Sequence, residues 1–233
     1  METEVRFYYS MDSKEDVLKY LKSFKELKYK GRFYECTDQY NHPMREYDFY
    51  SDDIDGRFRV RRTENDKTKK CMISWKRRLH VGEKIHNEEE IEVSIKPEDY
   101  DELCFLLTGV LHLYLLESYE RYRHVFSHKD VEIVLDEYPF GICLEIENKS
   151  KSKNGEVVIK EWLDKLGLEL EDAYPLSWDD KYEELCKEQN KRIEYLVRFD
   201  KDMPSVSNRF QNKKWRASLF YFKEYSWLLI IIL

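Results

Sequence analysis

Residues 131–147 constrain the fold most, because apolar and charged side chains alternate on both sides of a turn at Pro139 and Gly141. A period of two places successive side chains on opposite faces of a β-strand. After the turn, Glu145 and Glu147 therefore share one face, and aliphatic side chains fill the other. Two carboxylates on one strand face repel each other unless water or a cation screens them. The stretch predicts a β-hairpin with either a solvated acidic face or one side of a hard-cation site.

The same alternation recurs along the chain and predicts a sheet of about eight strands. Besides the hairpin, strands are expected over residues 2–9, 30–40, 46–50, 57–61, 69–78, 87–95 and 115–127. Apolar side chains at helical spacing predict helices over about 13–25, 97–109, 155–166 and 179–191. Short turns between most strands favour antiparallel pairing. The chain is therefore expected to be an α+β protein built on a closed or nearly closed sheet.

Charged side chains of one sign gather on one face of successive strands. These sets are Glu2, Glu4 and Arg6; Arg57, Arg59 and Arg61; Lys76; Glu88, Glu90 and Glu92; Arg121 and Arg123; Glu132 and Asp136; and Glu145 and Glu147. If the sheet closes with this face inside, the apolar face points outward and is covered by the helices. Burying an ion costs several kcal/mol unless it is well paired. A charged interior therefore indicates a highly charged ligand, because Arg and Lys match phosphate oxygens and carboxylates bind Mg²⁺ or Mn²⁺.

Composition narrows the class of protein and its setting. The formal net charge of −7 is the sum of 40 basic and 47 acidic side chains, so neither nucleic acid nor a membrane is expected as a partner. The 5 cysteines are far apart and none form a C-x-x-C pair, which fits a reduced, cytoplasmic setting. The N-terminus lacks the apolar run of a signal peptide, and the apolar residues 227–233 are too few to cross a bilayer.

Six charged motifs occur in a fixed order over about residues 1–185. They are Glu2-Thr-Glu4-Val-Arg6, Arg59-Val-Arg61 after Asp55-Gly56, Ile73-Ser-Trp-Lys76, Glu90-Ile-Glu92, Arg121 with Arg123, and Asp136 followed by Gly141 and Glu145-Ile-Glu147. In this order they resemble the triphosphate tunnel metalloenzymes of the CYTH superfamily. Class IV adenylyl cyclases, thiamine triphosphatases and inorganic triphosphatases belong to that superfamily. The resemblance implies a closed eight-stranded antiparallel β-barrel with a charged interior and helices packed outside.

The chain departs from the family pattern at three points. Its first motif begins at residue 2, so Glu2 is expected to be poorly held near a frayed terminus. The family has lysine where this chain has Arg6, which keeps the charge but not the flexible ammonium. The aromatic segment 34–50 offers two equivalents of the family's second-strand motif, Gln39-Tyr40 and Tyr47-Asp48, and the sequence does not choose between them.

The resemblance also implies roles for individual residues. Metal ligands would be Glu4, Glu145 and Glu147, with Glu2 acting through water or orienting the attacking water. Glu2, Glu4 and Arg6 would form the catalytic set, and the triphosphate would be bound by Arg6, Arg59, Arg61, Lys76, Arg121 and Arg123. Glu90, Glu92 and Asp136 would form a second metal site or hold the arginines in place. Surface salt bridges are the expected role of Arg57, Arg62, Arg77 and Arg78, and His124 is expected to be structural.

Three functions fit this site. The favoured one is a metal-dependent hydrolase of inorganic triphosphate, a nucleoside triphosphate or thiamine triphosphate, with Mg²⁺ or Mn²⁺ as cofactor. The first alternative is a class IV adenylyl cyclase that makes cyclic AMP and pyrophosphate, and the second is a binding module without turnover. The tunnel domain is expected over 1–192, followed by a C-terminal extension over 193–233, and a homodimer is compatible with the sequence.

Overall fold

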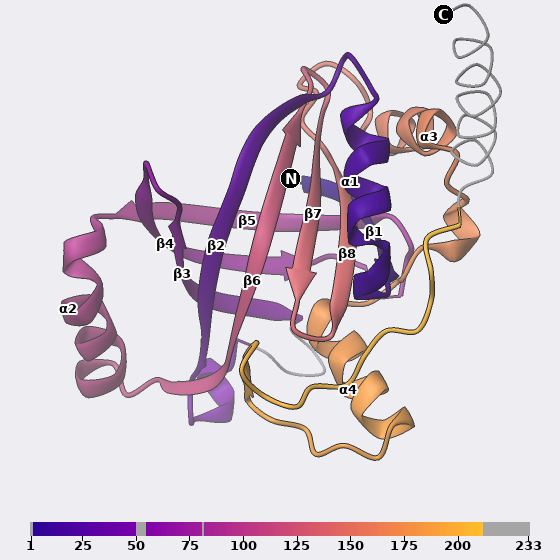
Figure 1. Ribbon diagram of the computed structural model, residues 1–233. Helices are drawn as coiled ribbons and strands as arrows, with labels where there is room; N and C mark the ends of the chain where they lie inside the picture. The colour runs from indigo at the N-terminus through magenta and orange to yellow at the C-terminus, as the bar shows by residue number, and fades with distance from the viewer. Residues whose placement is uncertain (1, 50–54, 81, 212–233) are drawn as a thin grey trace, which may run out of the picture.

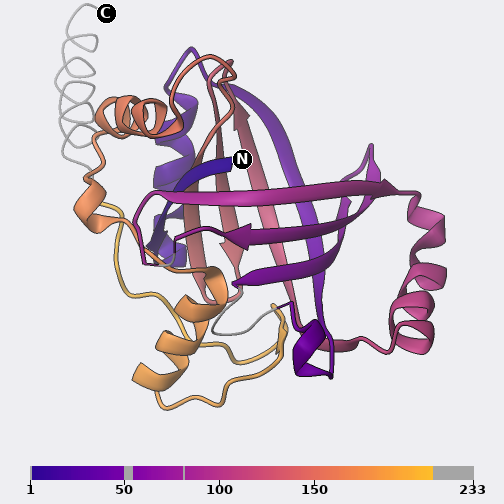
Figure 2. The ribbon, with the colours of Figure 1, turned by 180° about the vertical axis from the view of Figure 1, so that it is seen from behind.

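The structure is a computed structural model that describes residues 2–49, 55–80 and 82–211, and its strands form one sheet (Figures 1 and 2). In chain order the strands are β1 (Glu2–Tyr9), β2 (Lys28–Asn41), β3 (Gly56–Glu64), β4 (Lys69–Arg78), β5 (His86–Ile95), β6 (Tyr114–Ser127), β7 (Val131–Tyr138), β8 (Gly141–Asn148) and β9 (Leu196–Val197). Neighbours in the sheet run β2-β3-β4-β5-β1-β8-β7-β6, and β6 pairs again with β2. This pairing closes eight antiparallel strands into a barrel, as expected. The short β9 pairs with β6 in parallel.

The helices lie outside the barrel, as predicted (Figure 1). They are α1 (Lys14–Lys22), α2 (Tyr100–Phe105), α3 (Gly155–Leu166) and α4 (Trp178–Glu188). Single 3₁₀ or π turns occupy Met11–Ser13, Arg45–Tyr47, Pro97–Asp99, Leu106–Val110 and Leu170–Asp172. Both views place α1 and α3 on one side of the barrel and α2 on the opposite side (Figures 1 and 2). In the described part of the chain, no helix has the length and apolar character needed to cross a membrane.

The outward face of β1, β7 and β8 is apolar and packs against α1 and α3. Val5, Leu135 and Ile146 on the strands join Leu21 of α1 and Trp162 of α3 in one buried cluster. Full burial of a side chain of this kind contributes about 1.5–3 kcal/mol. Because alternate residues of the same strands point the other way, the packing that stabilises the barrel also directs its charged residues inward.

A second buried cluster covers the outward face of β2, β3 and β4. Tyr40, Val60 and Cys71 on these strands pack against Leu107 and Leu113 from the segment that contains α2. The predicted helix over 97–109 is therefore present, but as a 3₁₀ turn, a short α-helix and a π turn in succession.

The predicted strand over 46–50 is wrong for its described residues. A 3₁₀ turn occupies Arg45–Tyr47 instead, and residue 50 lies outside the described residues. The reason is local hydrogen bonding, since the side-chain oxygen of Asn41 accepts the backbone N–H groups of His42 and Phe49, each at 2.9 Å. These bonds fold the chain back at the end of β2 and remove Phe49 from any strand ladder.

Residues 198–211 contain no helix or strand, yet they pack on the barrel. The backbone N–H of Val206 donates to the carbonyl of Phe140 at 2.8 Å. The ring of Phe210 packs against Tyr9 and Tyr20. The apolar tail that begins near residue 218 lies outside the described residues.

Candidate functional site

A cavity of about 200 Å³ inside the barrel is lined by eight acidic and eight basic side chains. The acids are Glu2, Glu4, Glu88, Glu90, Glu92, Glu132, Glu145 and Glu147, and the bases are Arg6, Arg57, Arg59, Arg61, Lys76, Arg121, Arg123 and Lys149. Sheet order separates the two signs. The adjacent strands β5, β1 and β8 supply most carboxylates and form what we term the acidic wall. The strands β3 and β6, which flank β2, supply most arginines and form the basic wall.

Strand register brings the acidic wall together around Glu4. Glu4 lies opposite Glu147 of β8 and His86 of β5, and Glu2 lies opposite Glu88. Residues directly opposite in an antiparallel pair have Cβ atoms about 4.5–5.5 Å apart, so their carboxylates face one another closely. Such an arrangement requires positive charge nearby.

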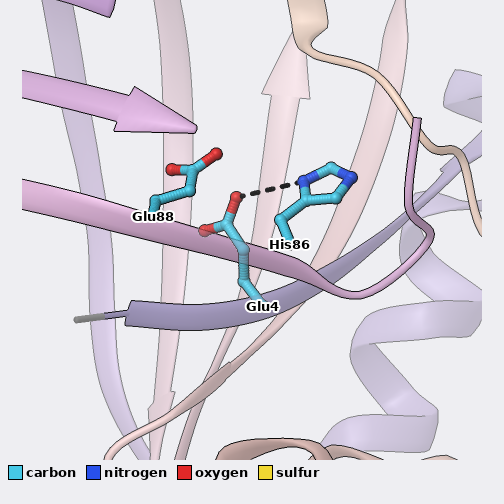
Figure 3. A group of neighbouring side chains, drawn as sticks. All are labelled: Glu4, His86 and Glu88. Atoms are coloured by element: carbon cyan, nitrogen blue, oxygen red, sulfur yellow. Dashed lines mark ion pairs between the residues drawn. The ribbon is translucent and has the colours of Figure 1, made fainter. Parts of the chain in front are cut away.

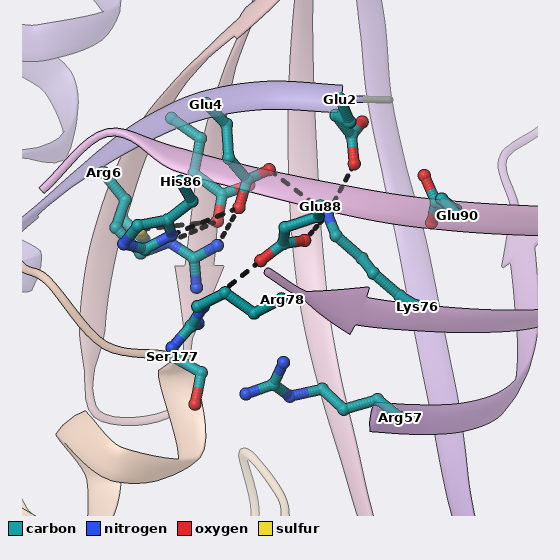
Figure 4. A network of polar contacts seen from close by, with 12 residues as sticks. Glu2, Glu4, Arg6, Arg57, Lys76, Arg78, His86, Glu88, Glu90 and Ser177 are labelled. Carbon is teal, nitrogen blue, oxygen red and sulfur yellow. Dashed lines mark hydrogen bonds and ion pairs between the residues drawn. The ribbon is translucent and has the colours of Figure 1, made fainter. Parts of the chain in front are cut away.

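Lys76 of β4 supplies that charge at one end of the acidic wall (Figure 4). Its ammonium nitrogen lies 2.5 Å from Glu88 Oε2, 2.6 Å from Glu2 Oε2 and 3.3 Å from Glu4 Oε2. Burial raises the pKa of Glu4, but the charges of Lys76 and Arg6 outweigh it, and the pKa falls well below its ordinary value. The pKa of Glu2 is lowered too, because Lys76 and Lys149 outweigh burial and the repulsion of Glu4.

The carboxylates of β8 lie beside different cations. Glu145 Oε2 lies 3.1 Å from a terminal nitrogen of Arg123, and Glu145 Oε1 lies 3.7 Å from Arg6 Nε. Glu147 contacts Lys149, whose ammonium is also 3.9 Å from Glu2 Oε1. The structure therefore places the four sequence-predicted metal ligands on the adjacent strands β1 and β8, each in contact with a cation of the chain.

Glu4, His86 and Glu88 form a tighter group in which one ligand atom of each lies within 4.8 Å of the others (Figure 3). His86 is 0% exposed, and neither ring nitrogen has a hydrogen-bond partner among the described residues. Its Nδ1 lies 3.8 Å from Glu4 Oε1, which is beyond hydrogen-bond distance. Burial lowers the pKa of His86 to about 4 despite the nearby Glu4, so the ring is neutral at pH 7.

These three residues fit a divalent cation, because two carboxylates and one neutral imidazole with free nitrogens are common metal ligands. The sequence reasoning did not assign His86 and Glu88 to the site. Glu88, Glu90 and Glu92 occupy alternate positions and therefore share one face of the strand. His86 is two residues before Glu88 and lies on the same face. That alternation was the available signal, whereas the pairing with β1 required the structure.

The basic wall contains three arginines of β3, of which Arg59 and Arg61 have few neutralising partners among the described residues. Arg59 contacts Glu90 Oε1 at 3.3 Å, and Arg57 contacts Asp55 at 3.1 Å. Among the described residues, Arg61 has no ion pair within salt-bridge distance. Burial, together with repulsion from Arg61, lowers the pKa of Arg59. The wall thus presents the positive charge of the buried Arg57 and Arg59 and the half-buried Arg61 to the cavity.

Arg57 and Arg78 correct the expected surface role. Arg57 is only 4% exposed and lines the cavity, and Arg78 is buried between Asp55 at 3.3 Å and Glu88 at 3.5 Å. The period of two that turns Arg59 and Lys76 inward acts on these two positions as well.

Arg62 and Arg77 lie outside the cavity, in agreement with the sequence pattern. Arg62 stacks on the ring of Tyr100, and Arg77 pairs with Glu89. Arg62 directly follows the inward-facing Arg61, and Arg77 directly follows the inward-facing Lys76. Each can therefore serve as a surface control for a substitution of its inward-facing neighbour.

The arginines of β6 have several acidic partners each, in contrast to Arg59 and Arg61 of β3. Arg121 contacts Glu35 at 2.7 Å and Asp136 at 2.8 Å, and it donates a hydrogen bond to the Tyr138 hydroxyl at 2.9 Å. Arg123 donates two hydrogen bonds to Asp136 at 2.7 and 2.6 Å. Asp136 is 0% exposed and orients both guanidinium groups.

Glu35 of β2 is a site residue that the sequence analysis missed. Its carboxylate accepts hydrogen bonds from Arg121 at 2.8 Å and from the Thr63 hydroxyl at 3.0 Å. Burial raises the pKa of Glu35, but Arg121 and Arg61 outweigh it, so the net shift is downward. The alternation of Glu35, Thr37 and Gln39 was the available signal, but Cys36 and Asp38 between them do not form a clearly apolar opposite face.

The remaining candidates lie at the edges of the cavity or outside the barrel. Glu90 and Glu92 line the cavity, and burial raises the pKa of Glu90 against the attraction of Lys76. Of the two possible second-strand equivalents, Gln39 is buried opposite Arg59, whereas Tyr47 is exposed. His124 has a structural position, with Nε2 2.7 Å from Glu137 Oε1 and Nδ1 2.9 Å from the Tyr29 hydroxyl.

Comparisons with known proteins agree with this geometry. The sequence model of the CYTH domain matches residues 1–174. No curated protein sequence matches the chain. Among solved structures, a protein of Pyrococcus horikoshii OT3, PH1819, is 23% identical with a TM-score of 0.59, covering 81% of this chain and 99% of its own.

Two further solved structures are similar. The adenylyl cyclase candidate HpAC1 of Hippeastrum, for which a dominant triphosphatase activity is described, is 17% identical with a TM-score of 0.55, covering 84% of this chain and 99% of its own. An adenylate cyclase candidate of Vibrio parahaemolyticus is 15% identical with a TM-score of 0.52, covering 76% and 95%. At these identities the likeness shows a shared fold.

Proposed function

This chain belongs to the CYTH family, and from that premise we propose that it hydrolyses a small molecule that carries a triphosphate, with Mg²⁺ or Mn²⁺ as cofactor. The substrate class is inorganic triphosphate, a nucleoside triphosphate or thiamine triphosphate. The proposal concerns the charged cavity of the barrel and the residues that line it.

The positive charge of the buried Arg59 and the half-buried Arg61 on β3 is the observation that carries the proposal. Arg59 has one ion pair at 3.3 Å, and Arg61 has none within salt-bridge distance among the described residues. Desolvated cations without full neutralisation destabilise a folded chain, so their presence favours an anionic ligand in the cavity. A linear triphosphate offers several negative oxygens in a row, and guanidinium groups bind such oxygens in a bidentate manner.

The two walls would act on different parts of the substrate. Arg59 and Arg61 would bind the phosphate chain from one side, and Lys76 would contact it where the acidic wall begins. Glu2, which lies beside the Lys76 ammonium at 2.6 Å, would orient the attacking water. A metal ion bound to the carboxylates would polarise the terminal phosphoryl group. Because these groups are held in place before the reaction, they stabilise developing negative charge without reorganisation.

Product analysis tests this function. The protein is incubated separately with tripolyphosphate, ATP and thiamine triphosphate, each with Mg²⁺ and with Mn²⁺, and the products are identified. Orthophosphate from any of the three supports the hydrolase. Cyclic AMP with pyrophosphate from ATP would instead identify an adenylyl cyclase. Tight substrate binding without any product under either metal would identify a binding module.

A further inference from the structure

We infer that His86 is a nitrogen ligand of the divalent cation, and that Glu4, His86 and Glu88 together bind a first-row transition ion such as Mn²⁺ in preference to Mg²⁺. This inference rests on the proposed function for the presence of a metal in the cavity. It adds the identity of one ligand atom and the metal preference that follows from it.

The first argument is the unsatisfied state of the imidazole. His86 is fully buried, and both of its ring nitrogens lack hydrogen-bond partners among the described residues. Buried polar groups in folded proteins are almost always bonded, so such an exception requires an explanation. His124 shows the alternative, because both of its ring nitrogens lie within 2.9 Å of a protein oxygen.

The second argument is the position of the ring. His86 and Glu88 are two residues apart on β5 and therefore point to the same face, and Glu4 lies opposite His86 on β1. One ligand atom from each residue lies within 4.8 Å of the other two (Figure 3). Three side chains that surround one point from two adjacent strands can bind an ion without a change of backbone.

The third argument concerns charge. Arg6 contacts Glu4, and Arg78 contacts Glu88 at 3.5 Å, so each carboxylate beside the ring has a positively charged partner (Figure 4). An imidazole nitrogen without a hydrogen-bond partner offers a lone pair to a cation, which is how histidine binds metals.

The metal preference follows from the ligand type. Mg²⁺ is a hard cation that binds oxygen ligands and keeps several waters, whereas transition ions accept imidazole nitrogen readily. A site with two oxygen ligands and one nitrogen ligand is thus expected to favour Mn²⁺ over Mg²⁺. Replacing His86 by Asn exchanges the nitrogen ligand for an amide oxygen, so it should weaken Mn²⁺ binding and leave Mg²⁺ binding nearly unchanged.

The experiment detects the Mn–N bond directly. The full chain, labelled with ¹⁵N-histidine, is loaded with one equivalent of Mn²⁺ and studied by electron spin echo envelope modulation. We expect a histidine nitrogen coupling in the wild type and in the control variant His112→Asn, and its loss in His86→Asn. Residue 112 is exposed and has φ 57°, a conformation that Asn adopts readily.

Competition binding of Mg²⁺ against Mn²⁺ supplies the second readout. In His86→Asn, the dissociation constant for Mg²⁺ divided by that for Mn²⁺ should fall at least about tenfold. Loss of a group that only supports a metal ligand already weakens metal binding by about tenfold or more. Bound Mn²⁺ without nitrogen coupling in the wild type would overturn the inference, and the wild-type spectrum decides this even if the variant fails to fold. If the protein hydrolyses a triphosphate but shows no nitrogen coupling, the proposed function stands and the His86 inference fails. If nitrogen coupling is present but no substrate is hydrolysed, the His86 inference stands and the proposed function fails.

Discussion

The ammonium nitrogen of Lys76 lies 2.5 Å from Glu88 Oε2, and this contact connects β4 to the acidic wall. The same nitrogen also contacts Glu2 and Glu4, so one lysine partly neutralises three carboxylates. A divalent cation bound to Glu4 and Glu88 would compete with Lys76 for these oxygens. Metal binding and the position of Lys76 are therefore expected to be linked.

Replacing Lys76 by Met should raise the affinity for Mn²⁺ and lower the affinity for triphosphate. The three carboxylates would lose a cation, which increases their attraction for a divalent ion, and the phosphates would lose a ligand. We expect changes of about tenfold in each dissociation constant, in opposite directions, since a charge-assisted contact is worth about 1.5–3 kcal/mol. Isothermal titration calorimetry measures both. Arg77→Met is the control, because Arg77 does not line the cavity and contacts Glu89 and the Trp75 ring on the outer face. If Lys76→Met weakened the binding of both Mn²⁺ and triphosphate, the linkage would be contradicted.

Glu145→Gln and Glu147→Gln should each reduce turnover at least about a hundredfold, because each removes a carboxylate expected to hold the metal ion that stabilises transition-state charge. Each change keeps the size of the side chain but removes a negative charge from the acidic wall. Initial rates of phosphate release with a saturating metal concentration measure the effect. Glu156→Gln on the exposed surface of α3 is the control and should retain the wild-type rate. A double variant at 145 and 147 that still turns over at the wild-type rate would exclude both carboxylates from the metal site.

Arg61→Gln should raise the KM for triphosphate substantially, whereas the neighbouring Arg62→Gln should not. Arg61 lines the cavity, but Arg62 points outward and stacks on Tyr100. Loss of one charge-assisted phosphate contact corresponds to about a tenfold to a hundredfold weaker interaction. Steady-state kinetics with the best substrate give both values. If the two substitutions raised the KM equally, Arg61 would have no specific role in binding the triphosphate.

Asp136→Asn should destabilise the protein by about 3–5 kcal/mol, because it removes the buried carboxylate that pairs with the buried Arg121 and the half-buried Arg123. Urea unfolding at pH 7 measures the free energy of unfolding. Glu132→Gln is the matched control on the same strand and the same face, since residue 132 is only half-buried at the cavity edge. A loss of stability no larger than that of the control would contradict the bridging role of Asp136.

The contribution of Glu137 to stability should depend on pH. Burial raises the pKa of Glu137, but hydrogen bonds from His124 and Arg32 and the charge of Lys14 outweigh it and lower the pKa from 4.5 to about 2. A carboxyl group with a depressed pKa stabilises the folded state above its unfolded pKa, and this stabilisation is lost as the pH falls from about 4.5 towards 2.

Glu137→Gln should therefore lower the free energy of unfolding by about 1–2 kcal/mol at pH 7, a range reduced for partial exposure to solvent. The difference between the two proteins should shrink steadily below pH 4.5. Chemical unfolding at pH 7 and at pH 3 gives the comparison. A difference that grows on acidification would have the opposite sign to this linkage.

The sequence predicted the barrel and most of its inner face, because a period of two determines which residues of a strand share a face. Arg59, Lys76 and Glu145 therefore point inward as expected. Sequence-based prediction was weaker where the pairing of neighbouring strands determines which side chains meet. Glu88 becomes part of the tightest acidic group only through its register opposite Glu2, and no local pattern encodes that pairing.

Arg57 and Arg78 show a different limit of sequence reasoning. Both alternate with outward-facing residues, so the strand pattern alone would place them inside the barrel. Clusters of adjacent arginines are usually solvated, however, and this general tendency led to the wrong prediction of a surface role. The structure places them beside Asp55, whose carboxylate contacts both. Glu35 was missed because the aromatic residues of β2 indicated a strand without indicating which of its faces lies inside.

The closing pair β2–β6 has a consequence for how the chain reaches its native state. This pair joins Lys28 to Ser127 and Asn41 to Tyr114, segments that are distant along the chain. Contacts of this kind form slowly, because a long loop must close first, and all-β barrels typically fold in milliseconds to seconds. Until the two strands meet, the inward charges stay hydrated and repel freely within each wall. We therefore expect barrel closure to limit the folding rate, and a bound polyanion or divalent ion to slow unfolding.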